Sequence, residues 1–465
     1  MRVEVEFTNL SEAVTERIAS HIRTAWPKVT IRDVKNSRVS ENADGSAVLI
    51  IRGDATSKPE ATSLITRKII ESDSASVEET IFQVDAKLAM LTNTEVAMAD
   101  RGPSVKGTIS RRDFLFGMMQ RHARVRDEPF VSESTCEAKF GCSKCVDVCP
   151  APGALMISNK SVNISNEHCV RCGLCATACP VAAIQVPQFT EGAYRALLAT
   201  MDASAAPKKT LVITCQEASV RHQPWMDVEE VQSVGVIGIK QLAFAADSSI
   251  GALVVYCPDA SCVGREQVNE AVKTINSITG GGAPVVAYLE GEDGAGKIGE
   301  IHASLNGREK PPSAAVGPWK DYVKAVKSIS KTSSDVAGLG FTEIEVKDSC
   351  TLCNACVDSC PHHALAIQTG ELTFYTEECT GCGYCEEICP ERSITLSEMA
   401  GPIKPSPAVV YRDEMIKCSS CGTPYASAKM LAKVSTLLQT DKMPRLCPAC
   451  KEKGMYQDLF PKPKV

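Results

Sequence analysis

Four groups of cysteines at nearly constant spacing, each followed by proline, constrain this chain more than any other feature. One group begins at Cys169 and has the spacing C-x2-C-x2-C-x3-C-P. Groups beginning at Cys350 and Cys379 repeat it, whereas the group beginning at Cys136 has five residues in its first gap instead of two. This spacing is typical of [4Fe–4S] cluster ligands. In such loops the fourth thiolate reaches across to a second cluster, so each loop needs a partner.

The repeat extends beyond the cysteines, because each group is followed by a similar short apolar run. These runs are GALMI at 153–157, AAIQV at 182–186, ALAIQ at 364–368 and SITLS at 393–397. Each is predicted to be a short helix that leads into a β-strand and closes the cluster loop. In spacing and in these runs, the chain resembles bacterial-type ferredoxins with two [4Fe–4S] clusters, and the polyferredoxins built from such modules.

Sequence separation pairs the four loops into two modules. Cys149 lies twenty residues before Cys169, and Cys360 lies nineteen residues before Cys379. The cross-over rule then predicts four [4Fe–4S] clusters, which we call sites 1 to 4. The predicted ligands are Cys136, Cys142, Cys145 and Cys179 for site 1; Cys169, Cys172, Cys175 and Cys149 for site 2; Cys350, Cys353, Cys356 and Cys389 for site 3; and Cys379, Cys382, Cys385 and Cys360 for site 4.

Two other uses of clustered cysteines fit the sequence less well. Disulfide scaffolds are typical of short secreted chains, whereas this chain has 465 residues. Structural zinc ligands usually come as separated C-x2-C pairs rather than three thiols in succession. The 23 cysteines, nearly all in metal-type groups, therefore indicate a cytoplasmic protein, either free or peripheral to a membrane complex.

Composition and charge narrow the function classes. Apolar residues make up 44% of the chain and charged residues 23%, as in ordinary globular proteins. No run approaches the roughly eighteen apolar residues that suggest a membrane span. The net charge of −6 disfavours a general nucleic-acid role. A chain of this length is expected to form about three to five domains.

Residues 1–100 contain no cysteine and are predicted to form a small α+β domain with a docking or structural role. Strands are expected over 1–7, 28–34 and 46–53, and helices over 11–26 and 59–71. Residues 101–129 are predicted to form a basic linker helix with Arg111, Arg112, Arg121, Arg124 and Arg126. A twin-arginine-like sequence at 108–118 lies too far along the chain for an export signal.

Beyond the first module, placed at 130–190, residues 208–307 are predicted to form a doubly wound α/β domain. Short apolar runs at 210–215, 251–257 and 283–289 are typical of buried parallel strands. Helical patterns lie between them, over Ile239–Asp247 and Arg265–Ile278. Cys215 and Cys257 end two of the strands, and Cys262 follows in a loop. Since the functional crevice of such sheets lies at the carboxyl ends of the strands, these three thiols are expected to converge there.

This domain resembles the delta subunit of the methyl-viologen-reducing hydrogenase. The resemblance covers about a hundred residues and rests on three features: Cys215, the sequence QLAFAADSSIGALVVYC at 241–257, and the C-x4-C pair Cys257 and Cys262. It implies a [2Fe–2S] cluster and electron transfer to a flavoprotein of the heterodisulfide-reductase type.

The sequence departs from that family at two positions. Ala218 stands where the family usually has a second cysteine after the first strand, and no cysteine occurs near Val236. Because a closed site needs four ligands, two interpretations stay open. Either a [2Fe–2S] cluster is completed by His222 or Asp259, or the domain has lost the cluster and serves only for docking.

The C-terminal part repeats the modular design. A linker at 308–340 with a helix near Trp319–Ile329 precedes the second module at 341–400. A zinc ribbon-like segment is predicted at 412–455, with a helix over 425–439 between two C-x2-C pairs, Cys418 with Cys421 and Cys447 with Cys450. Four thiols suit iron as well as zinc, so a fifth iron–sulfur site stays open here.

The predicted fold class is multidomain α+β, with two ferredoxin modules flanking an α/β domain. The predicted function is that of an electron-transfer subunit within a larger redox complex, with flavoprotein, hydrogenase or heterodisulfide-reductase-like partners. No catalytic residue and no small-molecule substrate site is predicted. Gly280-Gly281-Gly282 precedes a strand, the reverse of a nucleotide-binding loop. One alternative is a thiol- or sulfur-active reductase that uses Cys215, Cys257 and Cys262. Another is a redox-sensing regulator that binds nucleic acid through the zinc ribbon.

Overall fold

The structure is a computed structural model, and it divides into two compact units. Unit 1 comprises residues 1–136 and 144–331, and unit 2 comprises residues 137–143 and 332–465. The described residues are 3–8, 12–32, 47–52, 67–71, 77–93, 129–187, 189–203, 210–215, 220, 223, 225–280, 285–291, 294–305, 318–330, 335–439 and 446–459. The five arginines of the predicted basic linker and the twin-arginine-like sequence lie outside the described residues.

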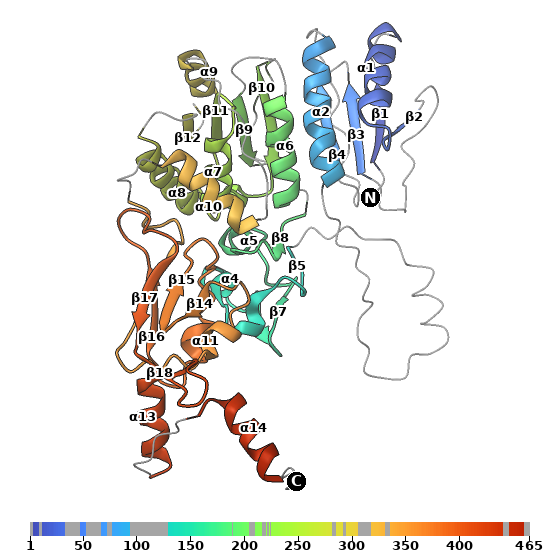
Figure 1. Ribbon diagram of the computed structural model, residues 1–465. Helices are drawn as coiled ribbons and strands as arrows, with labels where there is room; N and C mark the ends of the chain where they lie inside the picture. Colours follow the sequence, from blue (N-terminus) through green and yellow to red (C-terminus); the bar gives the residue numbers. More distant parts are fainter. Residues whose placement is uncertain are drawn as a thin grey trace, which may run out of the picture. The chain divides into compact units, whose positions relative to one another are not determined.

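The N-terminal part of unit 1 is a four-stranded parallel sheet packed with two helices (Figure 1). Its strands run in the order β2 (Thr30–Arg32), β1 (Val3–Thr8), β3 (Ala47–Arg52) and β4 (Arg67–Glu71), and its helices are α1 (Glu12–Ala25) and α2 (Val77–Asn93). Val5 and Phe7 alternate with glutamates in β1 and therefore share one face. They are buried with apolar residues of both helices, namely Ile18, Ile22, Val84, Leu88 and Leu91.

The prediction of a helix over 59–71 is wrong at its C-terminal end. Arg67–Glu71 forms strand β4, in which Ile69 and Ile70 pair with Ile50 and Ile51 of β3. Adjacent β-branched residues favour an extended backbone over a helix, and the partner strand was too distant in sequence to be noticed. Residues 59–66 lie outside the described part of the chain.

The described residues of 129–136 and 144–203, all in unit 1, form short antiparallel ribbons around the first pair of cysteine loops. β5 (Phe130–Val131) pairs with β8 (Ile184–Gln185), and β6 (Leu155–Ser158) pairs with β7 (Ser161–Ile164). The helices are the short α4 (Lys144–Asp147) and α5 (Leu174–Ala178) and the longer α6 (Glu191–Ala203). The apolar runs predicted to close the two loops supply β6 and β8, which confirms the strands expected there.

Residues 210–305 contain a second parallel sheet, with the strand order β10-β9-β11-β12. The strands are β9 (Thr210–Cys215), β10 (Met226–Val231), β11 (Ala252–Cys257) and β12 (Val285–Glu290). Associated with them are η2 (Val234–Val236), α7 (Ile239–Asp247), α8 (Arg265–Thr279), α9 (Gly294–Ser304) and α10 (Pro318–Ile329). The predictions of α7 and α8 are confirmed. Strand β10 was missed, because its sequence MDVEEV is acidic rather than a continuous apolar run.

The acidic residues of β10 are buried and paired with a lysine from helix α2. The Lys87 Nζ lies 3.0 Å from Asp227 Oδ1, also contacts Glu229 Oε1, and donates a hydrogen bond to the Val228 carbonyl oxygen at 2.6 Å. The side chain of Lys87 is 3% exposed, and those of Asp227 and Glu229 are 0% exposed. Burial alone would lower the pKa of Lys87, but the two carboxylates outweigh it and raise the pKa. The charges therefore hold the N-terminal sheet and its helices against the edge of the second sheet.

Unit 2 folds around the second pair of cysteine loops. β13 (Thr342–Val346) pairs with β16 (Ile394–Glu398), and β14 (Leu365–Gln368), β15 (Glu371–Phe374) and β17 (Ala408–Arg412) form a second antiparallel sheet. The short helices are η1 (Glu137–Phe140), α11 (Ala355–Asp358) and α12 (Tyr384–Glu387). The core joins apolar side chains such as Leu372, Phe374 and Ile394 to the buried cysteines Cys350, Cys356 and Cys379.

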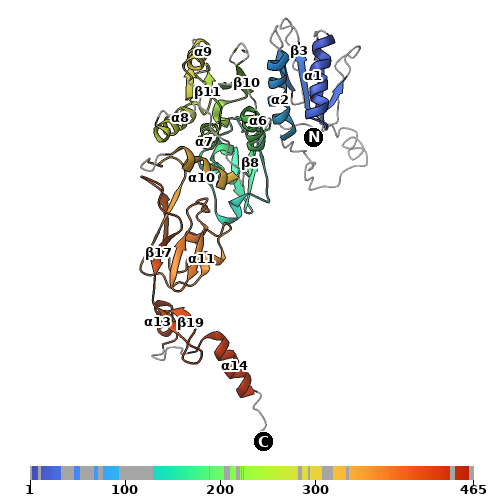
Figure 2. The same cartoon turned by 45° about the horizontal axis from the view of Figure 1, so that its top comes forward.

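The C-terminal segment of unit 2 is a short hairpin followed by two helices (Figure 2). β18 (Met415–Lys417) pairs with β19 (Pro424–Ser427), and α13 (Ala428–Leu437) and α14 (Pro448–Leu459) follow. The helix predicted over 425–439 therefore begins later than expected, because residues 424–427 pair as a strand. Ser427 accepts a hydrogen bond from the Met430 amide at 3.1 Å and so marks the true N-terminus of α13.

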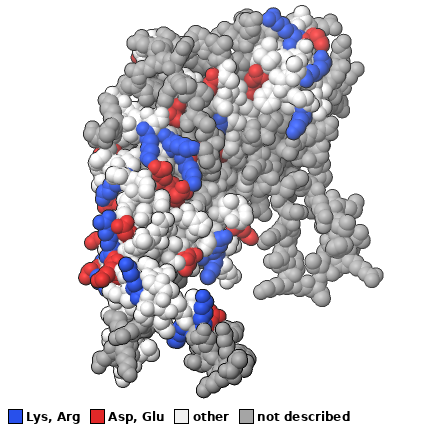
Figure 3. Space-filling view, in the orientation of Figure 1, with Lys and Arg blue, Asp and Glu red and all other residues white. Residues whose placement is uncertain are grey.

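No helix among the described residues is long and apolar enough to cross a membrane. On the described part of the face drawn in Figure 3, basic and acidic side chains are interspersed.

The buried Lys87 gives the first prediction. We expect Lys87→Met to lower the free energy of unfolding of unit 1 by about 3–5 kcal/mol, because two carboxylates would stay buried without their cation. All three tryptophans, Trp26, Trp225 and Trp319, belong to unit 1. Urea denaturation followed by tryptophan fluorescence therefore reports on this unit.

Lys273→Met is the matched control, because Lys273 pairs with Glu270 on the surface, with its side chain 65% exposed. Since the pKa of Lys87 is raised, its stabilising effect should persist below the ordinary lysine value of 10.5 and be lost as the pH rises through the higher folded-state pKa. Equal denaturation midpoints for the two variants would contradict this view of the interface.

Candidate iron–sulfur and metal centres

The three regular cysteine loops share one backbone conformation. The residues on either side of the second cysteine have positive φ angles in each loop: Arg171 (56°) and Gly173 (81°), Leu352 (50°) and Asn354 (72°), and Gly381 (68°) and Gly383 (86°). Left-handed backbone is uncommon for residues other than glycine, so its recurrence reflects a constraint of the loop itself. It curls the chain tightly around the cysteines.

Two cavities lie inside these loops, each lined by cysteines of two different loops. In unit 1, a small cavity is lined by Cys169, Cys172 and Cys175 together with Cys149 of the preceding loop. In unit 2, a small cavity is lined by Cys350, Cys353, Cys356 and Cys389. The remaining walls are largely apolar and include Pro150, Leu155 and Ile164 in unit 1, and Pro390, Leu372 and Ile394 in unit 2. Each cavity therefore gathers three thiols from one loop and a fourth from its partner.

The cysteines predicted for site 4 are also close neighbours. Burial raises the pKa of the Cys385 thiol, and the nearby thiols of Cys379, Cys382 and Cys360 raise it further, as does Cys356. Since Cys356 lines the cavity of the neighbouring loop, the two groups of thiols in unit 2 lie next to each other.

In unit 1, burial raises the pKa of Cys175 to about 12, with further contributions from Cys172, Cys169, Cys145 and Cys149. Thus Cys145, predicted for site 1, neighbours the thiols of site 2. Cys179 ends helix α5 and is buried. Cys136 belongs to unit 1, and Cys142 belongs to the short segment counted with unit 2.

The donor set fits an iron–sulfur cluster. The backbone amides of Ala183, Ala364 and Ser393 donate hydrogen bonds to the Sγ atoms of Cys179, Cys360 and Cys389 at 3.2, 3.3 and 3.3 Å. Amide donors stabilise a thiolate and help to set the potential of a cluster. Ionisation of crowded, buried thiols is unfavourable without a nearby cation, and iron would supply the positive charge that lets them bind as thiolates.

The α/β domain brings its three cysteines together at one end of the sheet. Strand order reverses between the neighbouring strands β9 and β11, which end at Cys215 and Cys257. The two Sγ atoms lie 3.4 Å apart, and both side chains are buried. Cys262 lies in the loop before α8, with its Sγ 3.4 Å from the Ser233 hydroxyl oxygen. We call these cysteines the three-thiol set.

The thiols of this set differ strongly in acidity. Hydrogen bonding with Cys257, then with Ser233 and the Val234 amide, lowers the pKa of Cys262 to about 6. The hydrogen bond with Cys262 has the opposite effect on Cys257: together with burial and the Cys215 thiol, it raises the pKa of Cys257. Of the two proposed additional ligands, His222 lies outside the described residues. The carboxylate of Asp259 accepts hydrogen bonds from the amide and hydroxyl of Ser261, each at 2.8 Å.

The three-thiol set lies next to the first pair of cysteine loops within unit 1. Helix η2, which Ser233 caps, packs on the loop that contains Cys172. Gly235 approaches this loop so closely that a Cβ atom would lie 2.4 Å from the Cys172 carbonyl oxygen, so only glycine fits. In addition, the buried Lys240 of α7 donates a hydrogen bond to the carbonyl oxygen of Cys179.

The four C-terminal cysteines form a compact group. The Sγ atoms of Cys418, Cys421, Cys447 and Cys450 all lie within 4.8 Å of one another, and no other such group of metal-ligand side chains occurs among the described residues. Backbone amides of Cys447 and Cys421 lower the pKa of Cys418 to about 6. Neighbouring thiols, Cys421 first, raise the pKa of Cys450 to about 12. A divalent metal that favours four thiolates would relieve this crowding. We call these cysteines the four-thiol set.

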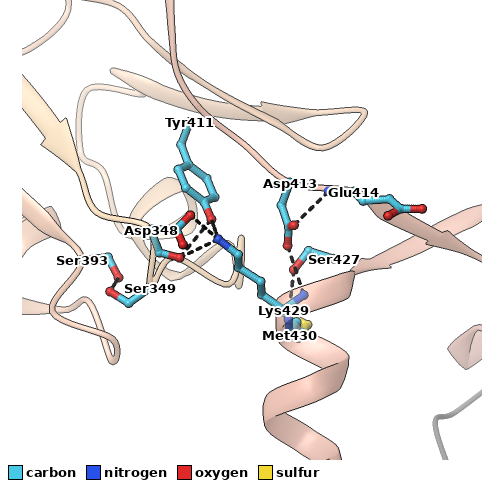
Figure 4. A network of polar contacts seen from close by, with 9 residues as sticks. All are labelled: Asp348, Ser349, Ser393, Tyr411, Asp413, Glu414, Ser427, Lys429 and Met430. Carbon is cyan, nitrogen blue, oxygen red and sulfur yellow. Dashed lines mark hydrogen bonds and ion pairs between the residues drawn. The ribbon is translucent and has the colours of Figure 1, made fainter.

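A polar network ties the C-terminal segment to the cysteine loop of Cys350 (Figure 4). The Lys429 Nζ donates hydrogen bonds to the carbonyl oxygen of Asp348 and to the Tyr411 hydroxyl, each at 2.7 Å, and pairs with the Asp348 carboxylate. The Ser427 hydroxyl donates to the Thr351 carbonyl oxygen at 2.7 Å. Asp413 accepts a hydrogen bond from the Lys429 amide at 3.1 Å. Sequence reasoning missed these residues, because single polar residues outside the motifs carry no linear signal.

Comparison with known proteins agrees with this geometry. Residues 122–183 match one family described as a 4Fe-4S dicluster domain, and residues 343–390 match another of the same description. The chain carries two dicluster domains. It is thus an iron–sulfur electron-transfer protein, and we call the two matched regions the first and second dicluster domains.

A second comparison, with an individual protein, matches a smaller part of the chain. This relative is a subunit of the ion-translocating oxidoreductase complex of Methanosarcina acetivorans, and it is 35% identical over 69 residues, or 15% of this chain. The match spans a quarter of that relative's length.

Thiol reactivity offers a test of the three-thiol set. After removal of iron by chelation, we expect iodoacetamide to modify Cys262 before Cys215 or Cys257, at a rate that rises with pH and levels off above about 6, because its pKa is lowered to that value. Peptide mass spectrometry measures the rate at each cysteine.

Ser233→Ala is the informative control, because it removes one hydrogen bond to Cys262 and should move the midpoint to higher pH. Faster modification of the fully buried Cys257 would contradict the described arrangement.

Proposed function

We propose that this protein is an electron-transfer subunit of a larger oxidoreductase complex and relays single electrons between four [4Fe–4S] clusters. The observation that supports this most directly is the pair of cavities in which three thiols of one loop meet a fourth from its partner. The relative named as a subunit of an oxidoreductase complex supports the place of such a protein within an assembly.

The proposed ligands are the sixteen cysteines of sites 1 to 4. For sites 2 and 3, the cavity linings coincide with the sets of the cross-over rule. For site 4, the thiols of Cys379, Cys382 and Cys360 add to the effect of burial in raising the pKa of Cys385, so the four thiols are close neighbours. When bound, a [4Fe–4S] cluster accepts and returns one electron with little change in geometry. The chain's own part is to hold the thiols, exclude water with apolar walls, and direct amide hydrogen bonds to sulfur.

Neighbouring sites within each dicluster domain suit short-range transfer. In unit 1 the thiol of Cys145 contributes to the raised pKa of Cys175, and in unit 2 that of Cys356 does so for Cys385, so thiols of paired sites lie close together. An electron that enters a dicluster domain at one site can therefore leave from the other.

The three-thiol set supports two further proposals. Its position beside the loop of Cys172 suits a [2Fe–2S] cluster in a doubly wound α/β domain like that of the hydrogenase delta subunit. The close approach of Cys215 and Cys257 and the low pKa of Cys262 instead favour a thiol-active reductase. Iron content separates the two, since a [2Fe–2S] cluster adds about two irons to about sixteen.

The proposed partners are redox proteins, namely flavoproteins or hydrogenase- or heterodisulfide-reductase-like subunits. The proposed location is the cytoplasm, either free or attached peripherally to a membrane complex. The proposed ligand of the four-thiol set is structural zinc, since four thiolates leave no open coordination position.

Paired cysteine substitutions test the cross-over assignment. We expect Cys350→Ser with Cys389→Ser to remove one cluster, about four irons, because both residues serve site 3. Cys379→Ser with Cys389→Ser should remove two clusters, about eight irons. If each loop held its own cluster, these losses would be reversed. Iron and sulfide analysis of anaerobically purified protein, with EPR of the reduced form, measures the loss.

Metal analysis of the same samples tests the four-thiol set. We expect about one zinc per chain, lost in Cys447→Ser while the iron content stays at about sixteen. Loss of iron instead of zinc in that variant would show that these thiols hold an iron–sulfur site.

A further inference from the structure

The second dicluster domain is an internal repeat with a constant offset of 29 residues. Its cysteines pair as 350 with 379, 353 with 382, 356 with 385, and 360 with 389. The same offset relates the positive-φ residues His363 (54°) and Arg392 (48°). By this repeat, Thr380 corresponds to Thr351, and His362 corresponds to Glu391. The two sites of this domain are therefore built from equivalent positions, so the segments that contact them can be compared residue by residue.

A segment from outside the repeat contacts the positions that flank site 4. This segment, residues 137–143, follows Cys136 in sequence and fills the long first gap of that motif, yet it packs within unit 2. The Glu137 carboxylate accepts a hydrogen bond from the Thr380 hydroxyl at 3.0 Å and another from the His362 Nε2. The Glu137 side chain is only 4% exposed.

Ring packing reinforces this docking. The rings of Phe140 and Tyr384 lie 5.3 Å apart with an interplanar angle of 51°, and Tyr384 sits between the site 4 ligands Cys382 and Cys385.

A different segment contacts the equivalent positions at site 3. The Ser427 hydroxyl, at the start of α13, donates a hydrogen bond to the Thr351 carbonyl oxygen at 2.7 Å. On the same helix, Lys433 pairs with the carboxylate of Glu391, the counterpart of His362. Lys429 of α13 pairs with Asp348, just before the first ligand of this site (Figure 4). Thus helix α13 occupies at site 3 the place that residues 137–143 occupy at site 4.

The two segments differ in charge. Helix α13 brings lysines, and each of them faces a carboxylate of the repeat, so charge near site 3 is balanced. The segment at site 4 brings a buried carboxylate that meets a hydroxyl and an imidazole, while its own Lys139 lies over the Phe140 ring. Because Glu137 is buried, water screens it far less than the lysines, which are 36% and 43% exposed.

A negative charge next to a cluster disfavours an added electron on that cluster, because the electron adds negative charge at the same place.

We propose that Glu137 makes the two clusters of the second dicluster domain unequal by lowering the reduction potential of site 4 relative to site 3. The inference depends on the proposed function, since it concerns clusters bound at sites 3 and 4. Site 4 then serves as the low-potential position from which an electron passes to site 3. The long first gap of the Cys136 motif contains Glu137, and we assign to this gap the function of directing electron transfer from site 4 to site 3.

Glu137→Gln tests the proposal, because it removes the charge and keeps an oxygen that can accept the Thr380 hydrogen bond. In an EPR-monitored redox titration of the full chain, we expect one reducible component to shift to higher potential. The electron's distribution between sites 3 and 4 should move about tenfold toward site 4, which corresponds to about 59 mV for one electron. In a Cys385→Ser background, where site 4 is lost, this shift should disappear.

Glu371→Gln is the matched control, because Glu371 lies on the same domain in an exposed pair with Arg412 and should leave every potential unchanged. Unchanged potentials in Glu137→Gln with full iron content would overturn the inference, whereas wild-type protein without reducible iron would overturn the proposed function instead. If Glu137→Gln fails to hold its iron, Lys433→Gln decides the matter. The Lys433→Gln substitution leaves the Glu391 carboxylate unpaired, so it should lower the reduction potential of site 3 and narrow the difference in potential between sites 3 and 4. An unchanged difference in potential would reject the proposal.

Discussion

The convergence of three thiols from one loop with a fourth from its partner is the interaction on which this structure depends. Small ferredoxin-like domains have little apolar material for a core, and in unit 2 the buried cysteines Cys350, Cys356 and Cys379 belong to the core itself. The cavities at sites 2 and 3 show how the short strands close over the cysteines. Since metal binding to such thiols is part of the folding free energy, cluster and fold are expected to stabilise each other.

The other parts of unit 1 are attached to this centre by close and buried contacts. Gly235 permits η2 to rest on the loop of Cys172, and Lys240 reaches the carbonyl oxygen of Cys179. Farther out, Lys87 pairs with the buried carboxylates of β10. These contacts place the three-thiol set beside the first dicluster domain. This position suits both proposals for the three-thiol set, a [2Fe–2S] cluster and a thiol-active reductase.

The second dicluster domain shows how similar loops acquire different surroundings. Its two halves repeat the same cysteines and the same left-handed residues, so the repeat alone would give nearly equal sites. The distinction comes from outside it, through Glu137 at one half and Lys429 and Lys433 at the other. A protein that passes electrons in one direction needs such a difference, and charged segments docked on a symmetric scaffold supply it.

The sequence by itself determined the iron–sulfur chemistry and the strands and helices with strong local patterns. Cysteine spacing is a local property, so the motifs and the two dicluster domains could be predicted, as could α7 and α8 from their helical periodicity. Strands β4 and β10 were missed, because each is stabilised by a partner distant in sequence: β3 for one, Lys87 for the other. Only the tertiary structure decided that Glu137 lies against Thr380 and Ser427 against Thr351, because hydrogen bonds between residues 243 and 76 positions apart leave no pattern in the chain.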